Sequence, residues 1–212
     1  INIDSAIVQN EVSLNRSEEK LVEMSNGCIC CTLREDLLEE VTKLAKENRF
    51  DYLVIESTGI SEPLPVAETF TFADEDGISL SDVAKLDTMV TVVDAVNFIK
   101  DYDQAKSLQE AGESMGEDDE RSVADLLVDQ VEFADIILIS KTDLVTSKEV
   151  ERLTAIIKTL NTDAKIIPIE NGNVEIDEVL NTNSFDFARA QQSPGWLKAV
   201  SYTHLTLPTM LW

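Results

Sequence analysis

The sequence predicts an α/β fold: a doubly wound, mostly parallel sheet with helices packed on it. Two observations support this. Short apolar runs at 52–55, 89–93 and 136–139 have the character of strands buried on both faces. They alternate with stretches of helical periodicity, as βα units do. A hydrophobic fraction of 43% with 27% charged residues is ordinary for a globular domain.

The elements follow in order. A first strand is expected at 20–24, before the turn signal Ser25-Asn26-Gly27. A helix from 33 to about 48 follows, because apolar side chains recur there every three or four residues. Thr32 and Glu35 have the spacing of a capping box at its start.

Further helices are expected at 121–133 and 147–160, and a last strand at 165–169. Pro168 places that strand at or near a sheet edge, because proline cannot donate a ladder hydrogen bond. The acidic stretch 101–120 is interpreted as a solvated loop or helix tip.

The net charge of −24 argues against nucleic acid and anionic membrane surfaces as partners. No apolar run approaches the roughly 20 residues that span a bilayer. The three cysteines lie together at 28–31, unlike a secreted disulfide framework, so a reducing cytoplasm is expected.

Both ends of the sequence are unusual. The opening at Ile1 resembles neither a signal peptide nor an initiation site, so we expect the chain to begin inside its domain. The tail 200–212 carries no charged residue and resembles a translated adaptor sequence, so we expect it to be non-native. It contains the single histidine, His204, to which we assign no function.

The richest chemistry lies in Cys28, Cys30 and Cys31, directly after Gly27. Thiolates are soft ligands that select transition metals, and a helix start lowers thiol pKa. Three thiolates leave a tetrahedral ion one ligand short, which suits a site that passes metal on or one completed by a carboxylate, a water or a partner chain. The alternatives are small buried residues at a tight turn, and a redox dithiol.

Two of the predicted strands end in polar residues. The first delivers Glu56, which could hold magnesium or orient a water, or could simply cap the next segment. The second delivers Ser140-Lys141-Thr142-Asp143, which resembles the Asn/Ser/Thr-Lys-x-Asp motif by which GTPases read guanine. In that motif the aspartate accepts two hydrogen bonds from the base and the lysine stem covers its face. Adenine lacks that donor pair, so the carboxylate would select the base.

Taken together, these motifs resemble the CobW family of metallochaperone GTPases, with its CobW/HypB/UreG-like nucleotide-binding domain. Gly27-Cys28-Ile29-Cys30-Cys31 is similar to the family's Gly-Cys-x-Cys-Cys signature. Glu56-Ser57-Thr58-Gly59 resembles its Walker B segment, and Val93-Asp94-Ala95 resembles a strand ending of the family. The likeness covers about residues 1–182, followed by a linker or the start of a missing domain at 183–199.

The resemblance implies a P-loop GTPase fold and a GTP-dependent metallochaperone that delivers zinc to a client metalloprotein. Cys28, Cys30 and Cys31 would hold the metal and Glu56 would lie by Mg²⁺ and the γ-phosphate. Ser140, Lys141 and Asp143, with Gly59, would bind the nucleotide. A cobalt-handling GTPase of cobalamin synthesis or nitrile hydratase activation, a non-hydrolysing storage or sensing module, and a homodimer remain open alternatives.

The sequence departs from that family in one respect that matters for activity. None of the seven glycines is followed by lysine, so we expect this chain to lack the family's phosphate loop and the family's first strand. We therefore expect this chain by itself to be a poor GTPase.

Overall fold

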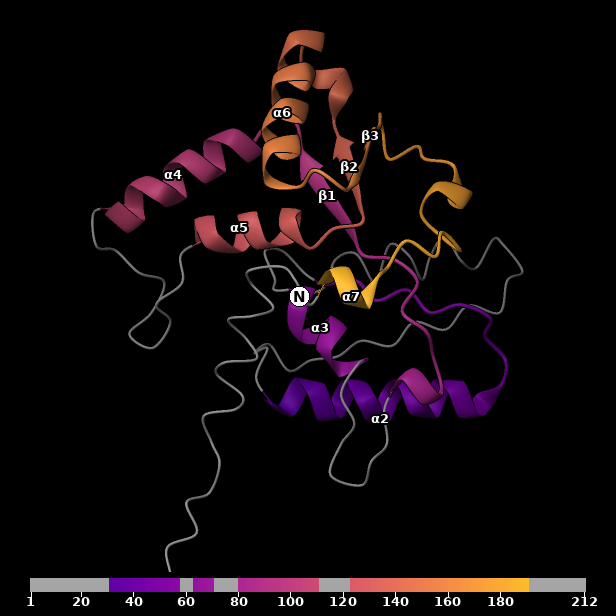
Figure 1. Cartoon of the computed structure of the whole chain (residues 1–212). Coiled ribbons are helices and arrows are strands. Elements are labelled where there is room, and N and C mark those ends of the chain that lie inside the picture. The colour runs from indigo at the N-terminus through magenta and orange to yellow at the C-terminus, as the bar shows by residue number, and fades with distance from the viewer. Residues whose placement is uncertain (1–30, 58–62, 71–79, 111–122, 191–212) are drawn as a thin grey trace, which may run out of the picture.

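The sheet of the computed structural model consists of three parallel strands. The structure describes residues 31–57, 63–70, 80–110 and 123–190. Strands β1 (Val90–Asp94), β2 (Ile136–Ser140) and β3 (Lys165–Pro168) lie in the order β1-β2-β3 (Figure 1). Both pairs are parallel, which confirms the predicted α/β class.

Three helices pack against one face of this sheet. They are α4 (Phe98–Glu110), α5 (Val123–Glu132) and α6 (Ser147–Leu160), and they lie together on one side of the strands in Figure 1. Their core includes Val131, Leu153 and Ile157, which close over Ile137 and Ile139 of β2. A side chain alternates between faces along a strand, so these two isoleucines define the helix-covered face.

The opposite face is only partly covered in the described residues. Ile136 and Leu138 of β2 are buried there under Ile169 and its neighbours in the segment after β3. On β1, which pairs Val92 with Leu138, the same face is open, and Val92 is 63% exposed. The central strand is therefore buried on both faces, as predicted, whereas β1 is not.

A second, smaller core joins α2 (Cys31–Glu47), α3 (Pro63–Thr69) and the 3₁₀ turn η1 (Leu80–Asp82). Leu37 and Val41 lie one turn apart on α2 and pack with Phe70 and Leu80. The predicted helix at 33–48 is thus confirmed, although it begins at Cys31. Its proposed capping box lies among side chains that the structure does not describe.

The helices predicted at 121–133 and 147–160 are confirmed as α5 and α6. Thr146 caps α6: its side chain accepts from the Glu149 N–H, and the Glu149 carboxylate accepts from the Thr146 N–H. The edge position of the strand carrying Pro168 is also confirmed. The first predicted strand, at 20–24, lies outside the described residues.

Two interpretations of the sequence need correction. Residues 101–110 belong to helix α4, whose first turns pack Phe98 and Tyr102 on the core, so half of the acidic stretch is helical. The apolar run 52–55 forms no strand, and Val54 is 70% exposed. A strand needs a neighbouring backbone for its ladder, and in the described part of the chain none pairs with 52–57.

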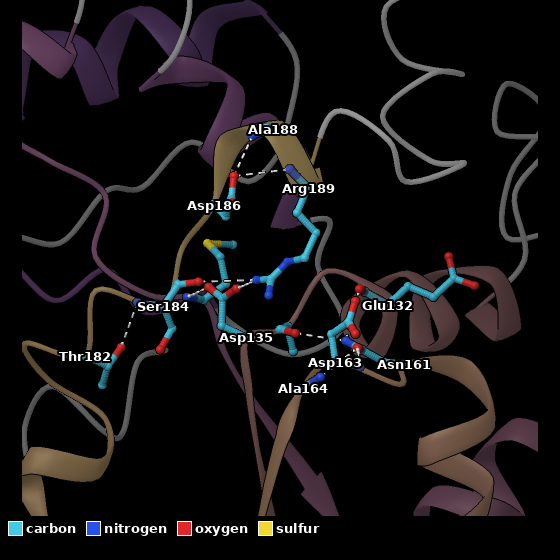
Figure 2. Close-up of polar contacts among 12 residues, drawn as sticks. Glu132, Asp135, Asn161, Asp163, Ala164, Thr182, Ser184, Asp186, Ala188 and Arg189 are labelled. Atoms are coloured by element: carbon cyan, nitrogen blue, oxygen red, sulfur yellow. Dashed lines mark hydrogen bonds and ion pairs between the residues drawn. The ribbon is translucent and has the colours of Figure 1, made fainter.

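The segment from Thr182 through α7 (Phe187–Ala190) is fastened to the amino end of the sheet (Figure 2). The Arg189 guanidinium pairs with the carboxylate of Asp135, which is buried and also accepts the Met89 N–H at 2.8 Å. Asp87 accepts N–H groups of Thr182 and Asn183 at 3.1 and 2.8 Å. We call residues 182–190 the carboxyl-terminal clasp.

Asn161 is the densest polar junction of the core. Its Nδ2 donates to the carbonyls of Val131, Glu132 and Ala134 at 2.8, 3.1 and 2.8 Å. Its Oδ1 accepts the N–H groups of Asp163 and Ala164 at 3.1 and 2.9 Å. One side chain thereby joins the end of α5, the end of α6 and the start of β3 (Figure 2).

In the parts of the chain that the structure describes, no helix is both long enough and apolar enough to cross a membrane.

Candidate functional site

The carboxyl ends of β1 and β2 bring two polar residues side by side. The register pairs Asp94 with Ser140, the last residues of the two strands. The Ala95 N–H donates to the Ser140 carbonyl at 3.0 Å, and the Ser140 hydroxyl donates to the Val93 carbonyl at 3.2 Å. In open α/β sheets ligands bind at this end of the strands, so a site is expected here.

The chain leaves β2 through a constrained turn. Lys141 has φ 58° and ψ 33°, the left-handed region that non-glycine residues rarely occupy. The turn is held by Thr142, whose hydroxyl donates to the Ile169 carbonyl at 2.9 Å, and by the Leu144 N–H, which donates to the Lys141 carbonyl at 3.0 Å. A backbone in this region persists where its surroundings fix it, and such positions cluster at functional sites.

The Lys141 ammonium lies 2.7 Å from Oδ2 of Asp94, although 47 residues separate them in sequence. The same carboxylate accepts the N–H groups of Val96 and Asn97 at 2.8 and 3.2 Å and the Asn97 side-chain amide at 2.9 Å. Burial opposes ionisation of Asp94, but the Lys141 ammonium and these N–H donors outweigh it and lower the pKa. Asp94 is therefore a fixed anion at neutral pH.

Asp143 follows two residues after this lysine, on the 3₁₀ turn η2 (Thr142–Leu144), and is exposed. In the described residues no hydrogen bond or ion pair engages its carboxylate, whose acceptor oxygens can meet a ligand. A carboxylate that receives two parallel N–H groups is a specific device, because a ligand without both donors leaves it unpaired. The predicted base-reading residues Ser140, Lys141 and Asp143 thus share one rigid turn.

The other predicted site residues are placed less completely. Glu56 is exposed at the end of segment 52–57, and no hydrogen bond or ion pair among the described residues joins it to the turn. Gly59, Cys28 and Cys30 lie outside the described residues. Cys31 is the first residue of α2, but its side chain is not described. Within the described chain no three acidic, cysteine or histidine residues form a metal-binding group.

Sequence reasoning gave no role to two residues of this site. The sequence identifies Asp94 only as part of a strand ending, whereas in the structure it holds Lys141 and caps the approach to α4. The available signal was local: an aspartate three residues before Asn97 at a helix start is typical of side-chain capping. The contact of Thr142 with Ile169 joins the ends of β2 and β3, and no sequence pattern indicates it.

Comparisons with known proteins identify relatives of this chain. The profile of the CobW/HypB/UreG nucleotide-binding domain matches residues 1–168. A Dictyostelium discoideum protein named zinc-regulated GTPase metalloprotein activator 1 is 51% identical, over 97% of this chain and 45% of its own length. The zinc chaperone CobW of Sinorhizobium sp is 31% identical, over 76% of this chain and 45% of its own.

Among solved structures, the Zn(II)-bound YjiA GTPase from E. coli superposes with a TM-score of 0.54 and 29% identity. That match covers 74% of this chain and 42% of the solved one. The chain therefore spans under half the length of these relatives.

Proposed function

Because the chain belongs to the CobW/HypB/UreG family of nucleotide-binding domains, we propose that it is the nucleotide-binding part of a GTP-dependent metallochaperone that delivers zinc to a client metalloprotein. The turn after β2 carries the proposal, because it combines a fixed lysine at Lys141 with an exposed carboxylate at Asp143. The names of the relatives support both parts of the proposal, since they include a GTPase activity and zinc.

Guanine recognition falls to this turn. The Asp143 carboxylate would accept the two N–H groups of the base edge, and the aliphatic stem of Lys141 would cover one face of the ring. Ser140 shapes the turn, since its hydroxyl bonds back to β1. Gly59 would lie beside the nucleotide in the segment that follows Glu56.

Glu56 is the candidate for the magnesium side of the site. A carboxylate oxygen is the ligand type that Mg²⁺ prefers, and Glu56 is exposed at the end of segment 52–57. When bound, Mg²⁺ supplies positive charge against the phosphates. Glu56 itself would hold the ion or orient a water molecule.

Zinc would be the cargo of Cys28, Cys30 and Cys31. The three thiols lie within four positions of sequence, and the last begins helix α2, whose amino end favours thiolates. Zinc is preferred to cobalt because three relatives are named for zinc. Thiolates alone accept either metal.

The guanine half is tested by changing the base preference of the full-length protein. Asp143→Asn replaces one acceptor oxygen by an amide donor, which suits xanthine, because xanthine carries a carbonyl where guanine carries its amino group. We expect GDP affinity to fall by about ten- to a hundredfold and xanthosine diphosphate affinity to rise. An Asp143→Asn protein that still prefers GDP would show that the turn does not read the base.

The metal half is tested by titrating the reduced, chelated protein with zinc against a competing chromophoric chelator. The variant with Cys28, Cys30 and Cys31 all changed to serine should lose one tight site, whereas Asp143→Ala should retain it. Cobalt titration measures the alternative cargo directly. If zinc binds the triple variant equally, the cysteines are structural. If oxidation but not zinc protects them from alkylation, they form a redox switch.

A further inference from the structure

The side chain of Lys141 depends on a single polar contact for its position. It is about half exposed, and among the described residues its ammonium bonds only to Oδ2 of Asp94. A free lysine side chain samples many rotamers, and fixing it in one orientation costs conformational entropy. A lysine stem that must lie over a flat base therefore gains from an anchor that selects its orientation before the ligand arrives.

Asp94 has the properties of such an anchor. Its Oδ1 accepts two backbone N–H groups of the turn before α4, so the carboxylate is fixed to the backbone. The second oxygen, Oδ2, is left to face Lys141 and the Asn97 amide. The strand register sets Asp94 beside Ser140, so anchor and turn are carried by adjacent strands of one rigid sheet.

We propose that Asp94 is a positioning residue for guanine recognition: it holds the Lys141 ammonium so that the lysine stem is preset to cover the base selected by Asp143. This inference rests on the proposed guanine site. It adds Asp94, at the end of β1, to a proposed guanine site that lies on the turn after β2.

The competing explanation is that Asp94 only caps the approach to α4. The two roles use different parts of the side chain, so two substitutions separate them. Asp94→Asn keeps an oxygen for the N–H groups of Val96 and Asn97 but removes the charge that faces Lys141. Asp94→Glu keeps the charge, and its longer side chain disturbs the cap.

The experiment measures affinity and dissociation rate of a fluorescent GDP analogue on the full-length protein. Positioning predicts that Asp94→Asn weakens GDP binding by about two- to fivefold, mainly through faster dissociation, and that Asp94→Glu binds more tightly than Asp94→Asn. In a Lys141→Met background, Asp94→Asn should have no further effect.

Asp186→Asn is the matched control. It makes the same change at another capped turn, where the Asp186 carboxylate accepts the N–H groups of Ala188 and Arg189 at 2.8 and 3.3 Å (Figure 2). That site lies in the carboxyl-terminal clasp, away from the turn after β2, so GDP affinity should not change.

The outcomes separate this inference from the proposed function. If Asp143→Ala abolishes GDP binding while Asp94→Asn leaves it unchanged, or if Asp94→Asn outperforms Asp94→Glu, Asp94 is only a cap and the inference is wrong. If Asp143→Ala leaves GDP binding unchanged, the guanine site itself is wrong, and the role of Asp94 falls with it.

Discussion

Replacing Asn161 by alanine should destabilise the domain more than any other single polar change in its described core. The substitution removes five contacts that tie α5, α6 and β3 together. The amide has only two hydrogens for its three acceptors, so about four full hydrogen bonds are lost. At roughly 1 kcal/mol each the loss approaches 4 kcal/mol.

Water should recover part of this loss, because Asp163 is exposed and Glu132 is half-buried beside the junction. We therefore expect Asn161→Ala to lower the free energy of unfolding by about 3 kcal/mol. That is a large part of the roughly 5–15 kcal/mol by which domains are stable. Urea denaturation followed by circular dichroism measures it as a lower midpoint at unchanged slope.

Asn161→Asp sharpens the test because it preserves shape. A carboxylate here would face three carbonyls in place of an amide donor, so its folded-state pKa should rise above the unfolded value of about 3.9. The loss of stability caused by the ionised carboxylate is then complete above the folded-state pKa, and it shrinks as the pH falls toward the unfolded-state pKa. The aspartate variant should recover stability relative to Asn161→Ala on acidification.

Asn173→Ala is the control, because Asn173 is exposed and its side chain takes no part in this junction; it should change stability by less than about 0.5 kcal/mol. An Asn161→Ala midpoint within the range of Asn173→Ala would refute the reasoning. A pH-independent difference between the alanine and aspartate variants would refute the electrostatic part.

Three further changes test the clasp, the acid response and a helix cap. Arg189→Met should lower the free energy of unfolding by about 1–3 kcal/mol, because it leaves Asp135 buried without its cation. Burial already raises the pKa of Asp135, so the loss of stability should shrink when thermal melts are repeated at lower pH, where Asp135 is protonated. Burial opposes ionisation of Asp87, but hydrogen bonds from the Tyr52 hydroxyl and from backbone N–H groups outweigh it and lower the pKa of Asp87. The ionised carboxylate therefore stabilises the folded domain above the ordinary pKa of 3.8, and this contribution is lost as the pH falls below that value. Asp87→Asn should accordingly make the free energy of unfolding fall less steeply with acidification. Thr146→Ala should cost about 1 kcal/mol in urea denaturation by removing the cap of α6, and an unchanged midpoint would count against that cap.

The parts of the fold that could be predicted are those that local sequence determines. Helix α6 has the predicted bounds because apolar periodicity is present in its own residues. Strand β2 was predictable because it is buried on both faces and therefore uniformly apolar. Pro168 located β3 at an edge through the donor that it lacks.

The failures have a common physical cause, which is dependence on a distant partner. The run 52–55 is as apolar as a buried strand, but a strand forms only when another backbone completes its ladder. The extent of helix α4 was not predicted, because 101–110 is acidic and poor in apolar residues, whereas the burial of Phe98 at the start of the helix anchors it to the core. In both cases the structure depends on a contact with residues far along the chain, which the composition of the segment itself does not indicate.

The candidate site likewise contains one residue that local sequence indicates and one that depends on a distant contact. The placement of Asp143 could be predicted, because its position two residues after a lysine and directly behind a strand is a feature of one short segment. Its proposed role in reading the base stays a prediction. Asp94 could not be predicted, because its relation to Lys141 exists only once β1 and β2 pair in register across 47 residues. Because the Asp143 carboxylate is exposed, a single substitution there can change which base is preferred, and Asp143→Asn tests this. Asp94 is fixed by strand register and by its cap before α4, so it cannot change without disturbing this end of the sheet. The proposed site therefore assigns base selectivity to Asp143 and the geometry of Lys141 to Asp94.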